Sequence, residues 1–160
     1  MTFLIVGVLL FSLPHLMLSL MPSVRAGIAG KVGEGPFKGL FALITAGGVV
    51  LIVLGWRSID PALLYAAPDW GGSVTRVLAF IGIILFFAGP RSNFILQNVR
   101  NPQLTGVGIW AVGHLFSNGD SRAFVLFGGL TLWAFVEIIA LNRRDGAWKR
   151  PEVKSLGTNI

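Results

Sequence analysis

Two histidines are the side chains most able to bind a metal in this sequence, because it contains no cysteine. His15 and His114 each lie within a long apolar stretch, where a polar side chain is costly and therefore marks a candidate functional site. Two neutral imidazoles that face each other across a bundle of helices can be the axial ligands of a haem b. These residues leave an alternative open, in which each is a core or interfacial histidine hydrogen-bonded to nearby backbone.

Residues in and before the second histidine's stretch could contribute to such a site. Arg100 stands just before the stretch that contains His114 and could bind a lipid phosphate or a haem propionate. Gly106, Gly108 and Gly113 lie within that stretch, and their missing side chains would let either a flat macrocycle or a neighbouring helix approach the backbone. Both interpretations of the glycines remain open from the sequence.

The acidic residues near these stretches have simpler interpretations. Glu137 could form an ion pair with Arg144 or accept a hydrogen bond from the outer nitrogen of His15. Because it is a lone carboxylate within an apolar stretch, a proton or solute pathway across a membrane is disfavoured. Asn118-Gly119-Asp120 is typical of a tight turn, with Asp120 as the N-cap of the helix that follows.

Composition places these residues in a membrane. Of 160 residues, 54% are hydrophobic and 12% are charged, and the mean hydropathy is +0.75. Soluble domains are about 45–50% apolar and about 25% charged, so too few ionic side chains are present to cover a water-facing surface. We therefore expect an all-α integral membrane bundle.

Five apolar stretches predict five transmembrane helices, although the fourth is short for the roughly 20 residues that a crossing needs. They cover residues 3–21, 40–56, 74–89, 104–116 and 123–141. Prolines fall between these stretches, except for Pro14, which should kink the first helix. The domain prediction is a transmembrane domain over 1–142 and a basic cytoplasmic tail over 143–160.

The lysines and arginines predict the orientation. Ten fall on one side of the predicted spans and three on the other, so the positive-inside rule places the N-terminus outside and the C-terminus in the cytoplasm. The net charge of +6 then reflects topology and attraction to anionic lipids, and we expect no nucleic-acid partner. Trp56 and Trp70 are expected to be anchors at the outer interface.

The order of several motifs resembles the NnrU family of bacterial membrane proteins, which is itself similar to zeta-carotene isomerase of plants and cyanobacteria. The matching segments begin with the first-span histidine and the stretch 32–43, and continue with 100–106, 110–115 and 118–120. The family's usual histidine before the proline is Asn101 here, so a role for that third imidazole is in doubt. A weaker similarity to isoprenylcysteine methyltransferases is disfavoured, because their paired C-terminal glutamates are missing.

The resemblance implies that His15 and His114 correspond to the histidines thought to hold haem b in the isomerase. A multi-pass protein of the bacterial inner membrane is then expected, linked to nitric oxide and nitrite metabolism or to cis–trans isomerisation of a carotenoid-like polyene. Its expected partners are membrane lipids, with a hydrophobic small molecule, nitric oxide or a second copy of the chain possible. The alternative is a non-catalytic scaffold or assembly factor for a respiratory denitrification complex.

Overall fold

The computed structural model describes residues 1–88 and 93–151, and these residues form helices joined by short connections. No strand is present within these two ranges, which confirms the all-α expectation; one isolated bridge pairs Leu63 with Asp120. The elements are α1 (Thr2–Leu20), α2 (Pro22–Val32), α3 (Glu34–Ser58), α4 (Gly71–Ala88), α5 (Asn93–Asn98), α6 (Pro102–Leu115), α7 (Ser121–Ala123), the π-helical turn η2 (Phe124–Gly128) and α8 (Gly129–Asp145).

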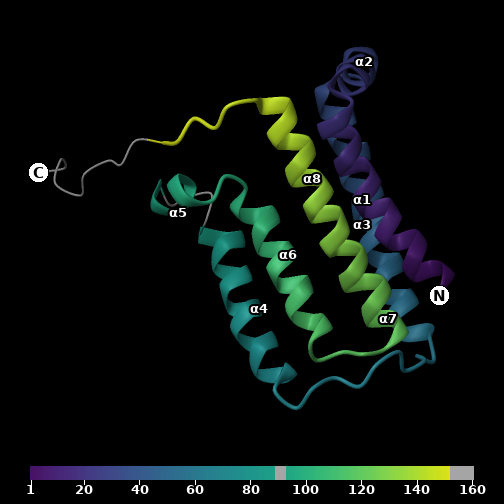
Figure 1. Cartoon of the computed structure of the whole chain (residues 1–160). Helices are drawn as coiled ribbons and strands as arrows, with labels where there is room; N and C mark the ends of the chain where they lie inside the picture. The colour runs from purple at the N-terminus through teal and green to yellow at the C-terminus, as the bar shows by residue number, and fades with distance from the viewer. Residues whose placement is uncertain (89–92, 152–160) are drawn as a thin grey trace, which may run out of the picture.

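The helix formed by α7, η2 and α8 lies between two helix pairs (Figure 1). The pair α1 and α3 packs on one side of it, and the pair α4 and α6 packs on the other. We call the end that holds α7 and the connection 59–70 the loop end, and the end that holds α2 and the last turn of α8 the basic end. The buried core follows the central helix and contains Ala111, Ala123, Phe127, Leu130, Trp133 and Ala134.

Glycines bring the backbones of the paired helices into direct contact. A Cβ atom added at Gly7 would lie 2.6 Å from the amide nitrogen of Ile52, and one at Gly55 would lie 2.4 Å from that of Leu4. In the other pair, a Cβ at Gly82 would lie 2.6 Å from the carbonyl oxygen of Gly106. No larger residue fits these crossings, so the glycines serve helix packing, as small residues do in membranes.

A glycine also sets the turn between α2 and α3. Gly33 has a φ of 89°, a conformation that residues with a Cβ rarely adopt, and α3 begins at the next residue. An ion pair of 2.7 Å between Arg25 and Glu34 joins the two helices across this turn. The residues between the first two apolar stretches thus include a helix, α2, which the five predicted stretches do not contain.

Within residues 1–88 and 93–151, three helices are long and apolar enough to cross a membrane: Thr2–Leu20, Glu34–Ser58 and Ser121–Asp145. Each of the five expected stretches contains a helix, but α4 and α6 are shorter, and Gly89 lies outside the described residues. The membrane character is therefore supported, while the crossing by α4 and α6 and the orientation stay predictions. The last helix continues to Asp145, past the expected boundary at 142.

Two adjacent glycines of α3 allow a matched test of the close crossing. A Cβ at Gly48 would lie 2.9 Å from the amide nitrogen of Phe11, whereas one at Gly47 would meet nothing within 4 Å. We expect Gly48→Ala to lower the free energy of unfolding by about 1–3 kcal/mol through overpacking. Gly47→Ala should leave it unchanged or raise it by up to about 1 kcal/mol through better helix propensity. Thermal unfolding in mild detergent, followed by circular dichroism, measures both, and equal effects would contradict the crossing.

Candidate functional site

His15 lies on α1 inside a cluster of aromatic rings. Its Nδ1 pairs with the carbonyl oxygen of Phe11 one turn earlier, at 2.6 Å. Its ring centroid lies 4.8 Å from Phe11, 5.0 Å from Phe41 of α3 and 5.4 Å from Trp133 of α8. With a neutral ring, Nδ1–H is the donor in this bond, and Nε2 keeps the lone pair that a metal ligand needs.

His114 lies on the last turn of α6 and has the same local arrangement. Its Nδ1 pairs with the carbonyl oxygen of Trp110 at 2.8 Å, which again leaves the lone pair on Nε2. The ring stacks on Phe127 of η2, with centroids 4.5 Å apart and an interplanar angle of 24°. The Trp110 ring contacts it from its own helix, also at 4.5 Å.

The two histidines are brought to the same central helix but not to each other. His15 contacts Trp133 and His114 contacts Phe127, two residues that are about 9 Å apart along a helix axis. They reach that helix from α1 and α6, which lie on its opposite sides (Figure 1). Both histidines fall in the described residues, and neither a hydrogen bond nor a ring contact joins them there.

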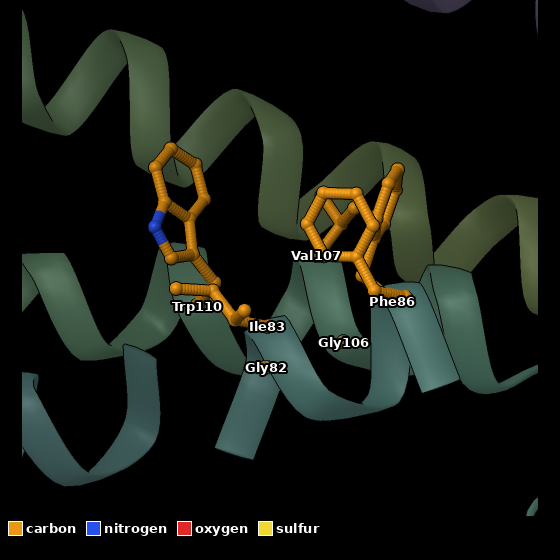
Figure 2. A pocket seen from close by; sticks show the side chains of 7 residues that line it. Gly82, Ile83, Phe86, Gly106, Val107 and Trp110 are labelled. Atoms are coloured by element: carbon orange, nitrogen blue, oxygen red, sulfur yellow. The ribbon is translucent and has the colours of Figure 1, made fainter. Parts of the chain in front are cut away.

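An apolar groove lies beside the His114 cluster. It has a volume of about 200 Å³ and is lined from α4 and α6 by Gly82, Ile83, Phe86, Phe87, Gly106, Val107 and Trp110 (Figure 2). Trp110 belongs to both the groove and the ring cluster, so it connects them. A flat or extended apolar molecule in the groove would therefore contact the same indole that touches the imidazole.

Arg100 lies far from both histidines, at the basic end. Its guanidinium donates to the carbonyl oxygen of Gly146 at 2.8 Å, and it precedes His114 by 14 residues, or about 21 Å along a helix. The structure thus brings Arg100 to the end of α8 and not to either imidazole. Beside it, Asn101 donates to the side chain of Asn142 at 2.9 Å, so the residue that replaces the family's usual histidine ties α6 to α8.

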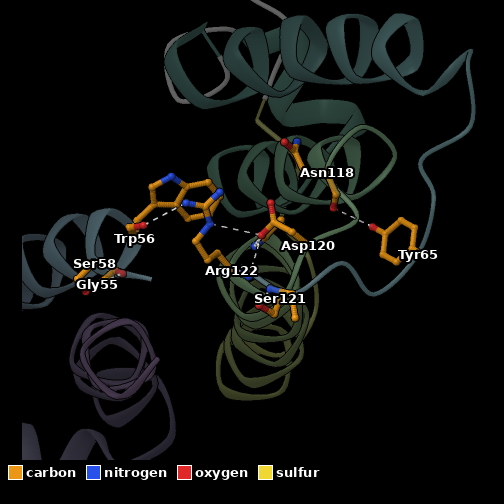
Figure 3. Close-up of polar contacts among 10 residues, drawn as sticks. Gly55, Trp56, Ser58, Tyr65, Asn118, Asp120, Ser121 and Arg122 are labelled. Atoms are coloured by element: carbon orange, nitrogen blue, oxygen red, sulfur yellow. Dashed lines mark hydrogen bonds and ion pairs between the residues drawn. The ribbon is translucent and has the colours of Figure 1, made fainter. Parts of the chain in front are cut away.

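The connection at the loop end holds the last turn of α6 and thus the backbone of His114. The Tyr65 hydroxyl donates to the carbonyl oxygens of Leu115 and Asn118, and Figure 3 shows Tyr65 beside Asn118. The side-chain amide of Asn118 donates to the carbonyl oxygen of His114 at 2.8 Å. A Cβ at Gly119 would lie 1.9 Å from the Tyr65 carbonyl oxygen, so the turn requires glycine. The motif Asn118-Gly119-Asp120 predicts this turn, whereas Tyr65 stands out in the sequence only as its single tyrosine.

The N-cap predicted at Asp120 is confirmed. Its carboxylate accepts hydrogen bonds from the amides of Arg122 and Ala123 at 2.8 and 3.0 Å (Figure 3). Burial raises the pKa of Asp120, but the hydrogen bonds from Ala123 and Arg122 and the charge of Arg122 outweigh it and hold the pKa below its ordinary value of 3.8.

Trp56 is half-buried and contacts other side chains of the bundle, and its role as an interface anchor stays a prediction. The Arg122 guanidinium lies 4.8 Å from the centre of the Trp56 ring, in a cation–π contact, and Trp56 also packs edge-on against Phe127 at 6.1 Å. The indole therefore points into the bundle. Trp70 is more than half exposed, as an anchor would be.

The expected ion pair between Glu137 and Arg144 is wrong. Glu137 is buried and accepts a hydrogen bond from the hydroxyl of Ser19 on α1, while Arg144 pairs with Asp145 at 2.7 Å. Position 137 faces the neighbouring helix, whereas position 144 lies at the exposed end of α8, so the two side chains are not brought together.

These features define a helical membrane protein with two aromatic-lined histidines. A family model described as NnrU protein matches residues 3–159, which is nearly the whole chain. The chain therefore belongs to the NnrU family, and this confirms the resemblance found in its motifs. No curated protein and no solved structure matches it.

The cap at Asp120 makes a prediction about acid stability. Asp120→Ala should lower the free energy of unfolding at neutral pH by about 1 kcal/mol, because two amides lose their acceptor. A carboxyl whose pKa is lowered by folding stabilises the protein above its unfolded pKa, and this contribution is lost as the pH falls through the folded pKa. The difference between wild type and variant should therefore shrink below about pH 3.8.

Chemical unfolding in detergent at a series of pH values measures this difference. Asp69→Ala is the matched control, since Asp69 is an exposed residue of the connection 59–70, at the same end of the bundle. A constant difference across the acid range would show that the charge of Asp120 does not contribute.

Proposed function

We propose that this NnrU-family protein binds haem b within the membrane, with Nε2 of His15 and of His114 as the two candidate iron ligands. The hydrogen bond from each Nδ1 to the carbonyl one turn earlier carries this proposal. Such a second bond fixes the tautomer and orientation of a ligating histidine and raises its basicity. A histidine that is hydrogen-bonded to nearby backbone through Nδ1 can therefore also bind iron through Nε2, so the two interpretations of these histidines are compatible.

The surroundings of both rings suit an apolar macrocycle. Each imidazole is bordered by aromatic side chains, and the groove beside His114 is lined by apolar residues alone. In contrast, Arg100 lies before the start of α6, while His114 lies in its last turn, about 18 Å from Pro102 along the helix, so a propionate contact with Arg100 is not part of the proposal. The loop end offers Arg122 as a nearer cation, although its guanidinium is already engaged with Asp120 and Trp56.

The distance between the two histidines bears on whether one or both of them would bind the same iron. In the described arrangement they contact the central helix about 9 Å apart along its axis, so each can hold iron by itself. Ligation of one iron by both would require α1 and α6 to approach each other past Phe127 and Trp133. The variants below distinguish these two modes.

A haem held in this way would supply an iron that binds nitric oxide or that assists rotation about a polyene double bond. The protein's own residues would exclude water and orient an extended apolar molecule along Trp110 and Phe86. We therefore assign the function to nitric oxide and nitrite metabolism or to isomerisation of a carotenoid-like polyene in the inner membrane.

Visible spectra of the purified protein with haem supplied test the proposal. We expect a Soret band in the wild type, and a pyridine haemochrome assay gives the haem stoichiometry. If both histidines hold one iron, His15→Ala and His114→Ala should each convert the low-spin spectrum to a high-spin one. If one histidine suffices, one variant alone should lose the band. Phe94→Ala, at an exposed position of α5, is the control that should change nothing.

A Soret band that is absent in every preparation, or that persists in the double variant His15→Ala/His114→Ala, would overturn the proposal. The second outcome would leave these histidines without a role as ligands.

The outward face of α3 favours a second candidate, a non-catalytic scaffold or assembly factor for a denitrification complex. Methyl groups added at Gly35, Gly39 and Gly47 would meet nothing within 4 Å, and Leu43 between them is 73% exposed. A partner helix could approach such a face closely. This candidate predicts that both histidine variants stay functional and that Gly39→Leu and Gly47→Leu abolish co-purification of a partner.

A further inference from the structure

The chain turns back after α8 and passes beside α5 and the start of α6 (Figure 1). Gly146 ends the helix with a φ of 65°, in the left-handed region that favours glycine. Two hydrogen bonds of 2.8 Å then hold the segment 146–151: Arg100 donates to the carbonyl oxygen of Gly146, and Gln97 donates to that of Pro151. This segment thus forms one wall of a pocket at the basic end.

The pocket, which we call the basic pocket, carries more positive than negative charge. It has a volume of about 500 Å³, and its charged lining residues are Arg100, Lys149 and Asp145. The Asp145 carboxylate pairs with Arg144 at 2.7 Å, whereas neither Arg100 nor Lys149 forms an ion pair within the described residues. One N–H group of Arg100 bonds to backbone, and a guanidinium carries several more. The basic pocket therefore offers cationic donors to an anion.

An apolar groove leads from the basic pocket along α6 and α8. Its first section, of about 240 Å³, shares Arg100 and Asn101 with the pocket and reaches Leu104 of α6 and Leu141 of α8. Leu104 also lines the second section, of about 350 Å³, which lies among α4, α6 and α8. Because each section shares residues with the next, the basic pocket and the two sections adjoin one another.

The second section has the polarity and the length that suit a lipid chain. Its walls are apolar except for Thr105 and Thr131, and the Thr131 hydroxyl already donates to the carbonyl oxygen of Phe127. Along α6 the section extends from Leu104 to Val112, or about 12 Å. One leaflet contributes about 15 Å to the hydrocarbon core of a bilayer. An extended acyl chain of one leaflet therefore matches this section.

This section is separate from the groove beside His114. Gly106 and Trp110 of α6 line the groove beside His114, whereas Gly108 and Val112 line the section described here. At about 3.6 residues per turn, these two pairs lie on opposite sides of α6. A ligand of the second section therefore does not compete with one beside His114, and the inference stands independently of haem binding.

We propose that an anionic diacyl phospholipid binds here, with its phosphate at Arg100 and Lys149 and one acyl chain in the groove between α6 and α8. Charge complementarity selects this occupant, because cations near a membrane surface attract anionic headgroups. A second copy of the chain in the same orientation would instead bring like charge to the basic pocket. Of the two roles that the sequence left open for Arg100, this site fits the lipid phosphate.

Native mass spectrometry of the delipidated protein in detergent, without added haem, tests the proposal by counting bound lipids. We expect phosphatidylglycerol to bind at least about fivefold more tightly than phosphatidylcholine with the same acyl chains, the factor that one cation near a lipid surface contributes. Glycerol phosphate, which has the anion without the chains, should not bind at the same concentrations.

Arg100→Gln tests the headgroup contact. It should lower the affinity for phosphatidylglycerol about fivefold and leave that for phosphatidylcholine unchanged, because the substituted amide carries no charge. Arg143→Gln is the matched control. It removes the same charge at the same end of the bundle, but Arg143 lines a different groove, between α1, α2 and α8, so the preference for phosphatidylglycerol should persist.

Gly108→Leu tests the acyl chain. A Cβ at Gly108 would meet only Ala134, at 3.7 Å, so a side chain is accommodated there and extends into the second section. This variant should weaken both lipids by a similar factor, since they have the same chains. Gly47→Leu is the control, because a Cβ at Gly47, on the outward face of α3, would meet nothing within 4 Å.

Equal affinities for the two lipids in the wild type would overturn the proposal. So would an equal loss in Arg100→Gln and Arg143→Gln, which would assign the attraction to the charge of the whole basic end. Glycerol phosphate that binds as tightly as the lipid would assign the basic pocket to a soluble anion, and a dimer that added lipid dissociates would assign the groove to a second copy. The Arg100 result does not depend on whether Gly108→Leu folds.

Discussion

Direct contact between helix backbones at glycine residues is the constraint on which the arrangement of both histidines depends. Helices in a bilayer gain little from excluding water from each other, so close packing decides which ones associate. Gly7, Gly48 and Gly55 join α1 to α3, and Gly82 and Gly106 join α4 to α6. Each histidine belongs to one of these pairs, and its ring contacts the central helix at Trp133 or at Phe127. The packing of each pair against the central helix thus separates the two imidazoles.

Much of the fold follows from composition, but the partners of individual side chains do not. Apolar stretches near bilayer length predict the helices, and the local signals of Asp120 and Gly119 predict the turn before α7. Helix α2 was missed because its 11 residues carry no apolar run of that length. Trp56 contacts Arg122, which is 66 positions away in the sequence, and Glu137 accepts a hydrogen bond from Ser19, which is 118 positions away. Such partners depend on which helices become neighbours, and a local pattern does not encode that.

In the candidate site, too, local features could be predicted from the sequence, whereas contacts between helices could not. Both histidines stand out by type, and their bonds to the preceding turn follow from helix geometry, since residues four apart share a face. Their lateral arrangement was not predictable, because it requires knowing that α8 lies between α1 and α6. The position of Arg100 was not predictable from sequence proximity either. Arg100 shortly precedes the stretch that holds His114, but the two residues lie at opposite ends of helix α6.

The two histidines differ in what surrounds them, and this difference bears on the chemistry that each could support. His15 lies one turn before Ser19, whose hydroxyl donates to the buried carboxylate of Glu137, whereas His114 borders an apolar groove lined by aromatic rings. Reduction of nitrite or nitric oxide consumes protons, while rotation about a polyene double bond consumes none. The groove beside His114 suits the second kind of reaction, because none of its lining residues takes up or releases a proton. Under the haem proposal, iron held by His114 would therefore be placed for rotation about a double bond and not for reduction of nitrite or nitric oxide.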